Sequence, residues 1–345
     1  MSRTPLISAC VPTYNGAEYL DACLSSLLEQ DLKDLEVVVG DDLSTDDTLE
    51  IARRRDDPRV RVLAFDSNAG MAGNWNRCIA RARGKYVALV AQDDLVAPQW
   101  GERLAQLLES HPEADLAFGR REFSIADERS RSVVGEFFEK SYPALLERFY
   151  RGIETVIPPE DMLDAALERL FEVNLIGEPS FTLVRRDHPA TRAGYHPRMK
   201  QLIDWEFASR FFVERPILHC PEILGTYRIH ASASSVGSAA SASQHREYML
   251  LLESVLVHFM ARLSPEQVER IESRRDQGQA DIVKHARILE AEVSALRAHV
   301  GVLEAELHGH RGHVQNLERI LEKIHGRRIY SVLCKIKDTL GGRPK

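Results

Sequence analysis

Five short apolar runs, separated by segments of helical periodicity, restrict the fold of this chain more than any other feature. The segment after the first run has helical periodicity, and one face of that helix is apolar, at Leu20, Cys23, Leu24, Leu27 and Leu28. Strands that alternate with helices in this way form a parallel sheet covered by helices. We therefore expect an α/β fold with a mostly parallel sheet, whose strands lie at residues 6–11, 35–40, 60–65, 86–91 and 114–119.

A helix-start signal follows the second run. Ser44 is a good N-cap residue, and Asp46 and Asp47 behind it would stabilise the positive end of a helix dipole. We therefore expect the second helix to begin at Ser44. A further helix has its apolar face at Trp75, Cys78, Ile79 and Ala82.

Residues 1–119 and 120–230 differ in pattern, which indicates two halves of one domain. The first half alternates strands and helices regularly, whereas the second half is mixed. Its helical periodicity is clearest near residues 142–150, 160–172 and 201–213.

The chain beyond residue 230 begins with small residues and continues as helix. Residues 231–243 have almost no large apolar side chain to bury, which predicts a flexible linker or flap. Residues 244–281 are predicted to be helical, and Ser264 with Pro265 and Gln267 is typical of a helix start.

Residues 282–324 carry the most regular pattern in the chain. Apolar residues are spaced alternately by four and three, with mostly leucine at the d positions of a heptad repeat. This repeat favours a parallel two-stranded coiled coil and therefore a homodimer. A single long amphipathic helix that packs on the preceding domain is the alternative. The a positions are Ala286, Val293, Val300, Leu307, Val314 and Leu321.

Residues 325–345 form a basic tail with apolar residues at helical spacing. Such a helix can lie on an anionic membrane surface, so we expect peripheral membrane contact. Docking on a protein partner or on the coiled coil is the alternative.

Charge, cysteines and hydropathy narrow the class of protein. A net charge of -7 argues against nucleic-acid binding, because tracking phosphates needs a basic face. The five cysteines show neither disulfide nor zinc-site spacing. The N-terminal residues lack the pattern of a signal peptide, and no apolar run approaches the ~18 residues that span a bilayer. We therefore expect a cytoplasmic protein.

Polar side chains follow three of the predicted strands, at residues 12–15 (PTYN), 41–42 (DD) and 93–94 (DD). The carboxyl edge of an open α/β sheet is where ligands bind, so these groups would meet there. Four carboxylates at one edge repel each other unless a cation or hydrogen-bond donors lie between them. A hard divalent cation, shared with substrate phosphates, suits this set.

These motifs, in this order, resemble family 2 of the glycosyltransferases. The family pattern P-T-Y-N at the first strand, D-D-x-S-x-D at the second and D-D at the fourth occurs here over roughly residues 6–230. The resemblance implies a GT-A fold and an inverting transfer of a sugar from a nucleoside diphosphate to an acceptor hydroxyl. It also implies a role in the synthesis of bacterial cell-surface polysaccharide or lipopolysaccharide.

The resemblance assigns the nucleotide-sugar site to nine residues. Of the two acids at the second strand, Asp42 is preferred as the partner of the base, and a helix-capping turn is the alternative for both. The nine are Pro12, Thr13, Tyr14, Asn15, Asp41, Asp42, Asn68, Gly70 and Asp93.

The resemblance also places a Mn²⁺ or Mg²⁺ ion at Asp93, Asp94 and His230. Many relatives have D-x-D-D where this chain has Ala91 in the first position, so we expect the ion to be weakly held. His230 belongs to a Y-R-x-H element of the family, which lies at residues 227–230 here. Arg228 of this element is implied as a contact to the diphosphate or the acceptor. Glu178 is implied as another such contact.

Asp204, at the predicted start of a helix, resembles the catalytic base of the family. A positioned carboxylate that takes the proton of the acceptor hydroxyl could contribute about 100-fold to 10,000-fold to the rate. A carboxylate that stabilises a helix dipole is the structural alternative, and it allows both roles.

The implied partners are a UDP-sugar or TDP-sugar, in preference to a GDP-sugar, and a glycan or lipid-linked acceptor. A catalytically inactive scaffold of a polysaccharide-assembly complex is the alternative function, supported only by Ala91. A dehydrogenase would need a glycine-rich G-x-G-x-x-G turn after the first strand, and the PTYN turn is not one.

Overall fold

The structure, a computed structural model, describes residues 4–150, 155–231, 242–280 and residue 294. The chain divides into two compact units, Met1–Glu272 and Ser273–Lys345. The described residues of the second unit are helical.

Several predictions for the C-terminal part fall on residues that the structure does not describe. The predicted coiled coil at 282–324, except for residue 294, and the basic tail at 325–345 lie outside the described residues, as does most of the linker predicted at 231–243.

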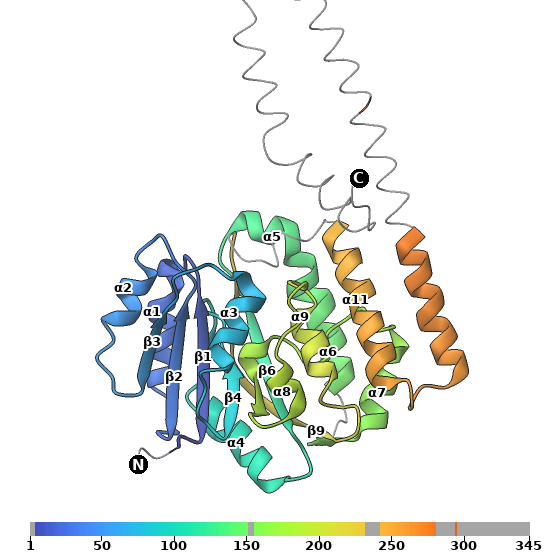
Figure 1. The fold of residues 1–345 in the computed structure, drawn as a ribbon, viewed down its shortest axis with the longest axis horizontal. Helices are drawn as coiled ribbons and strands as arrows, with labels where there is room; N and C mark the ends of the chain where they lie inside the picture. Colours follow the sequence, from blue (N-terminus) through green and yellow to red (C-terminus); the bar gives the residue numbers. More distant parts are fainter. Residues whose placement is uncertain (1–3, 151–154, 232–241, 281–293, 295–345) are drawn as a thin grey trace, which may run out of the picture. The chain divides into compact units, whose positions relative to one another are not determined.

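The first unit alternates strands and helices (Figure 1). The strands are β1 (Ile7–Thr13), β2 (Leu35–Asp41), β3 (Val60–Ala64), β4 (Tyr86–Leu89), β5 (Leu95–Val96), β6 (Leu116–Ile125), β7 (Val156–Ile157), β8 (Thr182–Arg185) and β9 (Ile217–Ile229). The helices are α1 (Ala17–Leu28), α2 (Thr48–Arg53), α3 (Gly70–Ile79), α4 (Trp100–Ser110), α5 (Glu128–Gly135), α6 (Tyr142–Tyr150), α7 (Pro159–Glu168), α8 (Pro189–Ala193), α9 (Ile203–Ser209) and α11 (Ala242–Phe259). A π-helix, η1 (Glu136–Ser141), a 3-10 helix, η2 (Pro179–Phe181), and a helix at 265–280 complete the described elements.

The strands form one mixed sheet in the order β3-β2-β1-β4-β8-β6-β9-β5, with β7 paired to β9. As predicted, β3, β2, β1 and β4 are parallel neighbours. β8 lies antiparallel between β4 and β6, so the fifth predicted strand does not pair with the fourth. β6 crosses the predicted boundary at residues 119 and 120, and both predicted halves therefore share one sheet.

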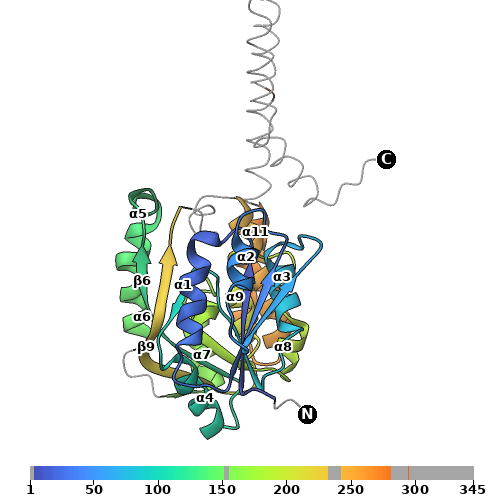
Figure 2. The same ribbon diagram turned by 90° about the vertical axis from the view of Figure 1, so that its left-hand side faces the viewer.

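Helices cover both faces of the parallel part of the sheet, as the alternating sequence predicts. Ile7, Ala9 and Val11 of β1 belong to one buried core with the apolar faces of α1 and α4. α3 packs on β1 and β2 from the other side, and Figure 2 shows α1 and α3 on opposite sides of these strands. The strand ends that carry the polar motifs therefore emerge from a rigid, buried layer.

The predicted helix start at Ser44 is wrong. α2 begins at Thr48, with Asp47 as its N-cap residue. The Ser44 hydroxyl, which in an N-cap would accept from the first helical turn, instead accepts from Asn15 N at 3.0 Å and donates to Asp41 Oδ1 at 2.5 Å. Side-chain hydrogen bonds to the local turn compete with helix formation and win here.

The helices of the second half are close to the predicted ones, although two are shorter. α6 has the predicted bounds, whereas α7 ends at Glu168, and Leu170 and Phe171 follow with positive φ. α9 covers only the middle of the predicted 201–213 stretch. Together, α5, η1 and α6 pack a second cluster onto β9, made of Val134, Phe138, Tyr142, Leu146 and Ile229.

The helix start predicted at Ser264 is confirmed. Ser264 N donates to Gln267 Oε1 at 2.8 Å, and Gln267 N donates to Ser264 Oγ at 3.2 Å. This reciprocal pair is a capping box.

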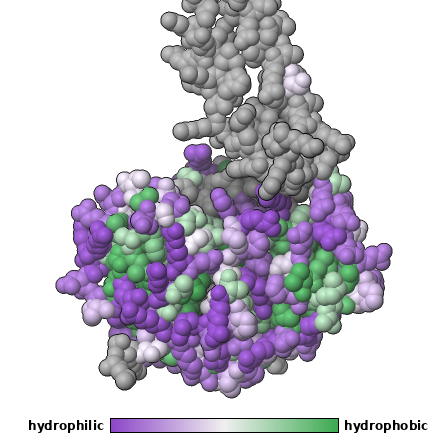
Figure 3. Space-filling model, in the orientation of Figure 1, coloured by the Kyte–Doolittle hydropathy of each residue, from purple (hydrophilic) through white to green (hydrophobic). Residues whose placement is uncertain are grey.

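The surface in the orientation of Figure 1 is largely hydrophilic, with apolar areas on the α11 side and on the side of β1–β3 (Figure 3). Among the described residues, no helix is both long and apolar enough to cross a membrane.

Candidate functional site

The turn after β1 is bonded to the turn after β2. Asn15, whose φ is 47°, donates from its backbone N to Ser44 Oγ at 3.0 Å, and its Oδ1 accepts from Thr45 N at 2.8 Å. Tyr14 exposes 47% of its surface, while its backbone N donates to Gln92 Oε1 at 3.0 Å. The predicted PTYN residues therefore lie at the sheet edge, as expected from the parallel strands.

Asp41 is buried within its own turn. Its carboxylate accepts from Ser44 N at 3.1 Å and Ser44 Oγ at 2.5 Å, and the Thr13 hydroxyl donates to it at 3.3 Å. These bonds close the turn after β2, but they do not cap a helix, because α2 begins only at Thr48. Pro12 precedes Thr13 in β1, paired in register with Gly40.

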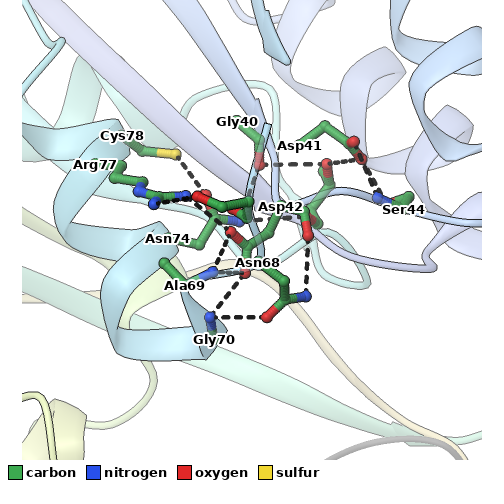
Figure 4. Close-up of polar contacts among 12 residues, drawn as sticks. Gly40, Asp41, Asp42, Ser44, Asn68, Ala69, Gly70, Asn74, Arg77 and Cys78 are labelled. Carbon is green, nitrogen blue, oxygen red and sulfur yellow. Dashed lines mark hydrogen bonds and ion pairs between the residues drawn. The ribbon is translucent and has the colours of Figure 1, made fainter. Parts of the chain in front are cut away.

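Asp42 holds the start of α3 (Figure 4). Its carboxylate, 2% exposed, accepts from Ala69 N at 2.9 Å and Gly70 N at 2.9 Å, and lies 3.3 Å from Arg77 Nη1. The Asn68 amide donates to the Asp42 carbonyl at 2.9 Å. The structure thus brings together the predicted residues Asp42, Asn68 and Gly70, and the carboxylate has a structural task. Its contact with a base stays a prediction.

Asp93 and His230 meet at the ends of β4 and β9. His230 Nε2 lies 3.0 Å from Asp93 Oδ2, and the imidazole stacks on Tyr19, with ring centroids 4.1 Å apart. Arg228 also contacts Tyr19. Its guanidinium carbon lies 5.1 Å from the centroid of the Tyr19 ring, and its Nη2 donates to the Tyr19 carbonyl at 3.2 Å. Tyr19 thus fixes both His230 and Arg228.

Asp94 differs from its neighbour because it is fully buried. Its Oδ2 accepts from Ser180 Oγ at 2.5 Å, and its Oδ1 accepts from Arg228 N at 3.1 Å. Burial, and after it the negative charge of Asp93, raises the pKa of Asp94 well above its usual range. As a metal ligand, Asp94 would have to give up these bonds, so that role stays a prediction.

The fit to a divalent ion is limited to two protein side chains. Asp93 is 22% exposed, and His230 presents a ring nitrogen beside it. No group of three or more potential ligands forms among the described residues. An ion held by one carboxylate and one imidazole would take its other ligands from phosphate oxygens and water, as Mg²⁺ commonly does. At the position of the missing carboxylate, Ala91 N donates to Ser180 Oγ at 3.0 Å.

Asp204 lies in the first turn of α9, as predicted. Its Oδ2 accepts from Asn174 Nδ2 at 3.1 Å, and its Oδ1 accepts from Trp205 N at 2.7 Å. Burial, and after it the negative charge of Glu178, raises the pKa of Asp204 to about 7. A carboxyl group that titrates near neutral pH is suited to general base catalysis.

α11 fixes the helix that carries Asp204. The carboxylate of Glu247 accepts from the backbone N of Gln201 at 2.7 Å and Leu202 at 3.2 Å, so it caps the start of α9. Ser254 donates to Glu206 Oε1 at 2.7 Å. Neither contact has a local sequence signal, because the partners are more than forty residues apart.

The segment that begins at Glu178 links the two parts of the site. Ser180 bonds to Asp94, whereas Glu178 raises the pKa of Asp204 and lies 2.6 Å from Arg121 Nε. Glu178 was expected to contact the diphosphate or acceptor, and the structure pairs it with a buried arginine instead of leaving it open. Sequence reasoning missed Arg121, because it lies beyond the strand predicted at 114–119, and it gave Ser180 no partner.

Comparisons with known proteins agree with this geometry. Residues 8–163 match the family model described as glycosyl transferase family 2. An uncharacterised protein of Mycobacterium tuberculosis is 30% identical over 230 residues, which cover 67% of this chain and 69% of that protein. The putative teichuronic acid biosynthesis glycosyltransferase TuaG of Bacillus subtilis is 33% identical over 124 residues, which cover 35% of this chain and 48% of TuaG.

Two solved structures share the fold. S. aureus TarS 1–349 in complex with UDP-GlcNAc is 20% identical, with a TM-score of 0.54 over 80% of this chain and 71% of that chain. The mannosyltransferase PcManGT from Pyrobaculum calidifontis, in complex with GDP-Man and Mn²⁺, is 16% identical, with a TM-score of 0.53 over 99% of this chain and 89% of that chain. Together with the ordered strand-end motifs, these matches show that the chain belongs to family 2 of the glycosyltransferases.

Proposed function

We propose that the chain transfers a sugar, with inversion, from a nucleoside diphosphate donor to an acceptor hydroxyl, with Asp204 as the general base. The observation that carries this proposal is the Asp204 carboxyl, held by Asn174 and with its pKa raised to about 7. At neutral pH this group can take a proton that an ordinary aspartate, with a pKa near 4, would leave on the hydroxyl.

The proposed reaction is a single displacement. The acceptor oxygen attacks the anomeric carbon while its proton passes to the Asp204 carboxylate. The bond from the anomeric carbon to the phosphate oxygen breaks, and the nucleoside diphosphate leaves with the electron pair. One attack from the face opposite the leaving group inverts the anomeric centre.

A divalent ion, Mn²⁺ or Mg²⁺, is proposed to offset the charge of the leaving diphosphate. Asp93 and His230, 3.0 Å apart, would hold it. The partly exposed carboxylate of Asp93 and an imidazole nitrogen of His230 are ligands that such an ion accepts. Support also comes from PcManGT, which was solved with Mn²⁺.

The donor is proposed to be a UDP-sugar or TDP-sugar, and the acceptor a glycan or a lipid-linked sugar of a cell-surface polysaccharide. TarS with UDP-GlcNAc and PcManGT with GDP-Man support a nucleotide-sugar ligand, and TuaG is named for teichuronic acid biosynthesis. The sugar could be a hexose or a deoxyhexose.

A thermal-shift screen with UDP-, TDP- and GDP-sugars, each with Mn²⁺ or with EDTA, tests donor and metal together. A true donor at about 100 times its Kd adds ~2.7 kcal/mol of stability, so its Tm shift should stand out from the others. We expect the shift with a UDP- or TDP-sugar and a smaller one in EDTA. Equal shifts with and without metal would exclude the ion. In a separate hydrolysis assay, a catalytically inactive scaffold would release no sugar from any donor.

The remaining proposals concern assembly. The heptad repeat at 282–324 supports a homodimer, and the basic tail supports a cytoplasmic protein held at the inner face of an anionic membrane. Co-sedimentation with anionic liposomes should decrease when residues 327–345 are deleted. Unchanged co-sedimentation would contradict the role of the tail.

A further inference from the structure

Arg121 is a charged residue in the interior of the domain. It lies on β6, its side chain is 1% exposed, and its Nε is 2.6 Å from Glu178 Oε2. Burial alone would lower the pKa of Arg121, but Glu178 together with Tyr142 and Tyr150 raises it above its usual value, so the guanidinium stays charged. A charge in such a position is costly to bury unless every donor has a partner.

The other guanidinium nitrogens reach the hydroxyls of two tyrosines. Nη2 donates to Tyr142 Oη at 2.7 Å, and Nη1 donates to Tyr150 Oη at 3.3 Å. Each hydroxyl then donates to a backbone carbonyl of the loop that precedes Glu178, Tyr142 to Asn174 at 2.7 Å and Tyr150 to Leu175 at 3.2 Å. Arg121 therefore holds both the carboxylate and the backbone of this loop.

Gly177 makes this approach possible. Its φ is +101°, a backbone conformation that residues other than glycine rarely adopt. A Cβ there would lie 2.3 Å from the Arg121 guanidinium carbon. The loop thus closes around the guanidinium with no side chain between them.

The same loop holds Asp204. The Asn174 amide nitrogen donates to Asp204 Oδ2 at 3.1 Å and to the Gly177 carbonyl at 2.9 Å. Its Oδ1 accepts from Gly177 N at 2.9 Å. Asn174 cannot turn away without breaking the loop that Arg121 fixes, so the position of Asp204 depends on Arg121.

The charged groups around Asp204 are few. Tyr142 of α6 and Tyr195 interact with it electrostatically, but the pKa of each is raised, chiefly by burial, so both stay neutral near pH 7. On α9, Glu206 is paired with Arg210 at 3.0 Å, and on α11 the carboxylate of Glu247 is bound by backbone N–H groups. The Glu178 carboxylate is therefore the charged group that acts on Asp204, and Arg121 is the ion-pair partner of that carboxylate.

We propose that Arg121 is a positioning residue for the reaction: it fixes the loop that orients Asp204, and it balances the charge that Glu178 places beside Asp204. The kinetic part of this inference rests on the proposed function, in which Asp204 is the base. The electrostatic part does not, because the carboxyl of Asp204 can be observed without turnover.

Because Glu178 and Arg121 carry opposite charges, removing one or the other should shift the pKa of Asp204 in opposite directions. Removing the negative charge in Glu178→Gln leaves Arg121 unbalanced, which should lower the pKa of Asp204 by about one unit. Removing the positive charge in Arg121→Met should raise it by about one unit, and the double variant should return close to the wild type. Arg121→Lys keeps the charge but loses the fork of donors, so it should keep the pKa while lowering kcat.

The experiment is a carbon-13 NMR titration of the full chain labelled at aspartate carboxyls, with the Asp204 signal assigned by its loss in Asp204→Asn. The pH profile of kcat is measured beside it. Because the base must be ionised, kcat rises with pH through the pKa of Asp204. A decrease of one unit in Glu178→Gln should raise the ratio of activity at pH 6 to that at pH 8 about fivefold. Arg120→Met, a half-exposed neighbour on β6 paired with Glu147, is the matched control and should change neither readout.

The outcomes separate the two claims. Unchanged Asp204 titration in Glu178→Gln, or a shift to higher pH, would overturn the inference, and Glu178→Gln decides this even if Arg121→Met fails to fold. A shifted NMR titration with an unshifted kcat profile would support the electrostatic inference and remove Asp204 as the base.

Discussion

Single residues of the same type have different tasks in this site because their surroundings differ. Asp93 keeps a partly exposed carboxylate beside His230, whereas the neighbouring Asp94 is buried, and its pKa is raised. Burial and the charge of Glu178 raise the pKa of Asp204 to about 7. Two or more acids with separated pKa values are the usual arrangement of an acid-base site.

Asp42 provides a residue-scale prediction. Asp42→Ala would remove the buried carboxylate that accepts from two N–H groups at the start of α3 and pairs with the Arg77 guanidinium. We expect the free energy of unfolding to fall by about 2 kcal/mol, measured by urea denaturation. Asp47→Ala, on the same sheet edge but exposed and without a capping hydrogen bond, should change it by less than about 0.5 kcal/mol. Equal losses in the two variants would show that Asp42 is not a structural acceptor.

At the scale of elements, the sequence predicts best where the signal is local. The apolar runs that form strands, the apolar face of α1 and the capping box at Ser264 have their sequence signals within a few residues, and they are confirmed. The predicted start of α2 is wrong because the Ser44 hydroxyl bonds to Asn15 and Asp41 and not to the first turn of a helix.

Elements that depend on distant partners were not predictable. β8 enters the sheet between β4 and β6 only because tertiary packing places it there. The cap of α9 comes from Glu247, 46 residues beyond Gln201. In the same way, the sequence indicated Asp204 by its family motif, but not the loop and the arginine that orient it.

At the scale of the whole molecule, the predicted coiled coil should set the oligomeric state. We expect the full chain to scatter light as a dimer, with twice the 39.0 kDa mass of one chain. A truncation after residue 280 should be monomeric, and it keeps α11, which caps α9. A monomeric full chain would contradict the coiled coil.

The most direct test of Asp204 as the general base of sugar transfer compares Asp204→Asn with the wild type in a single transfer assay. Donor affinity is measured on the same samples. A base acts on the acceptor in the transition state and not on the donor. We expect kcat to fall by about 100-fold or more while the donor Kd changes little, and the wild-type product to have the inverted anomeric configuration by NMR. Turnover of Asp204→Asn near the wild-type rate would contradict this role of Asp204.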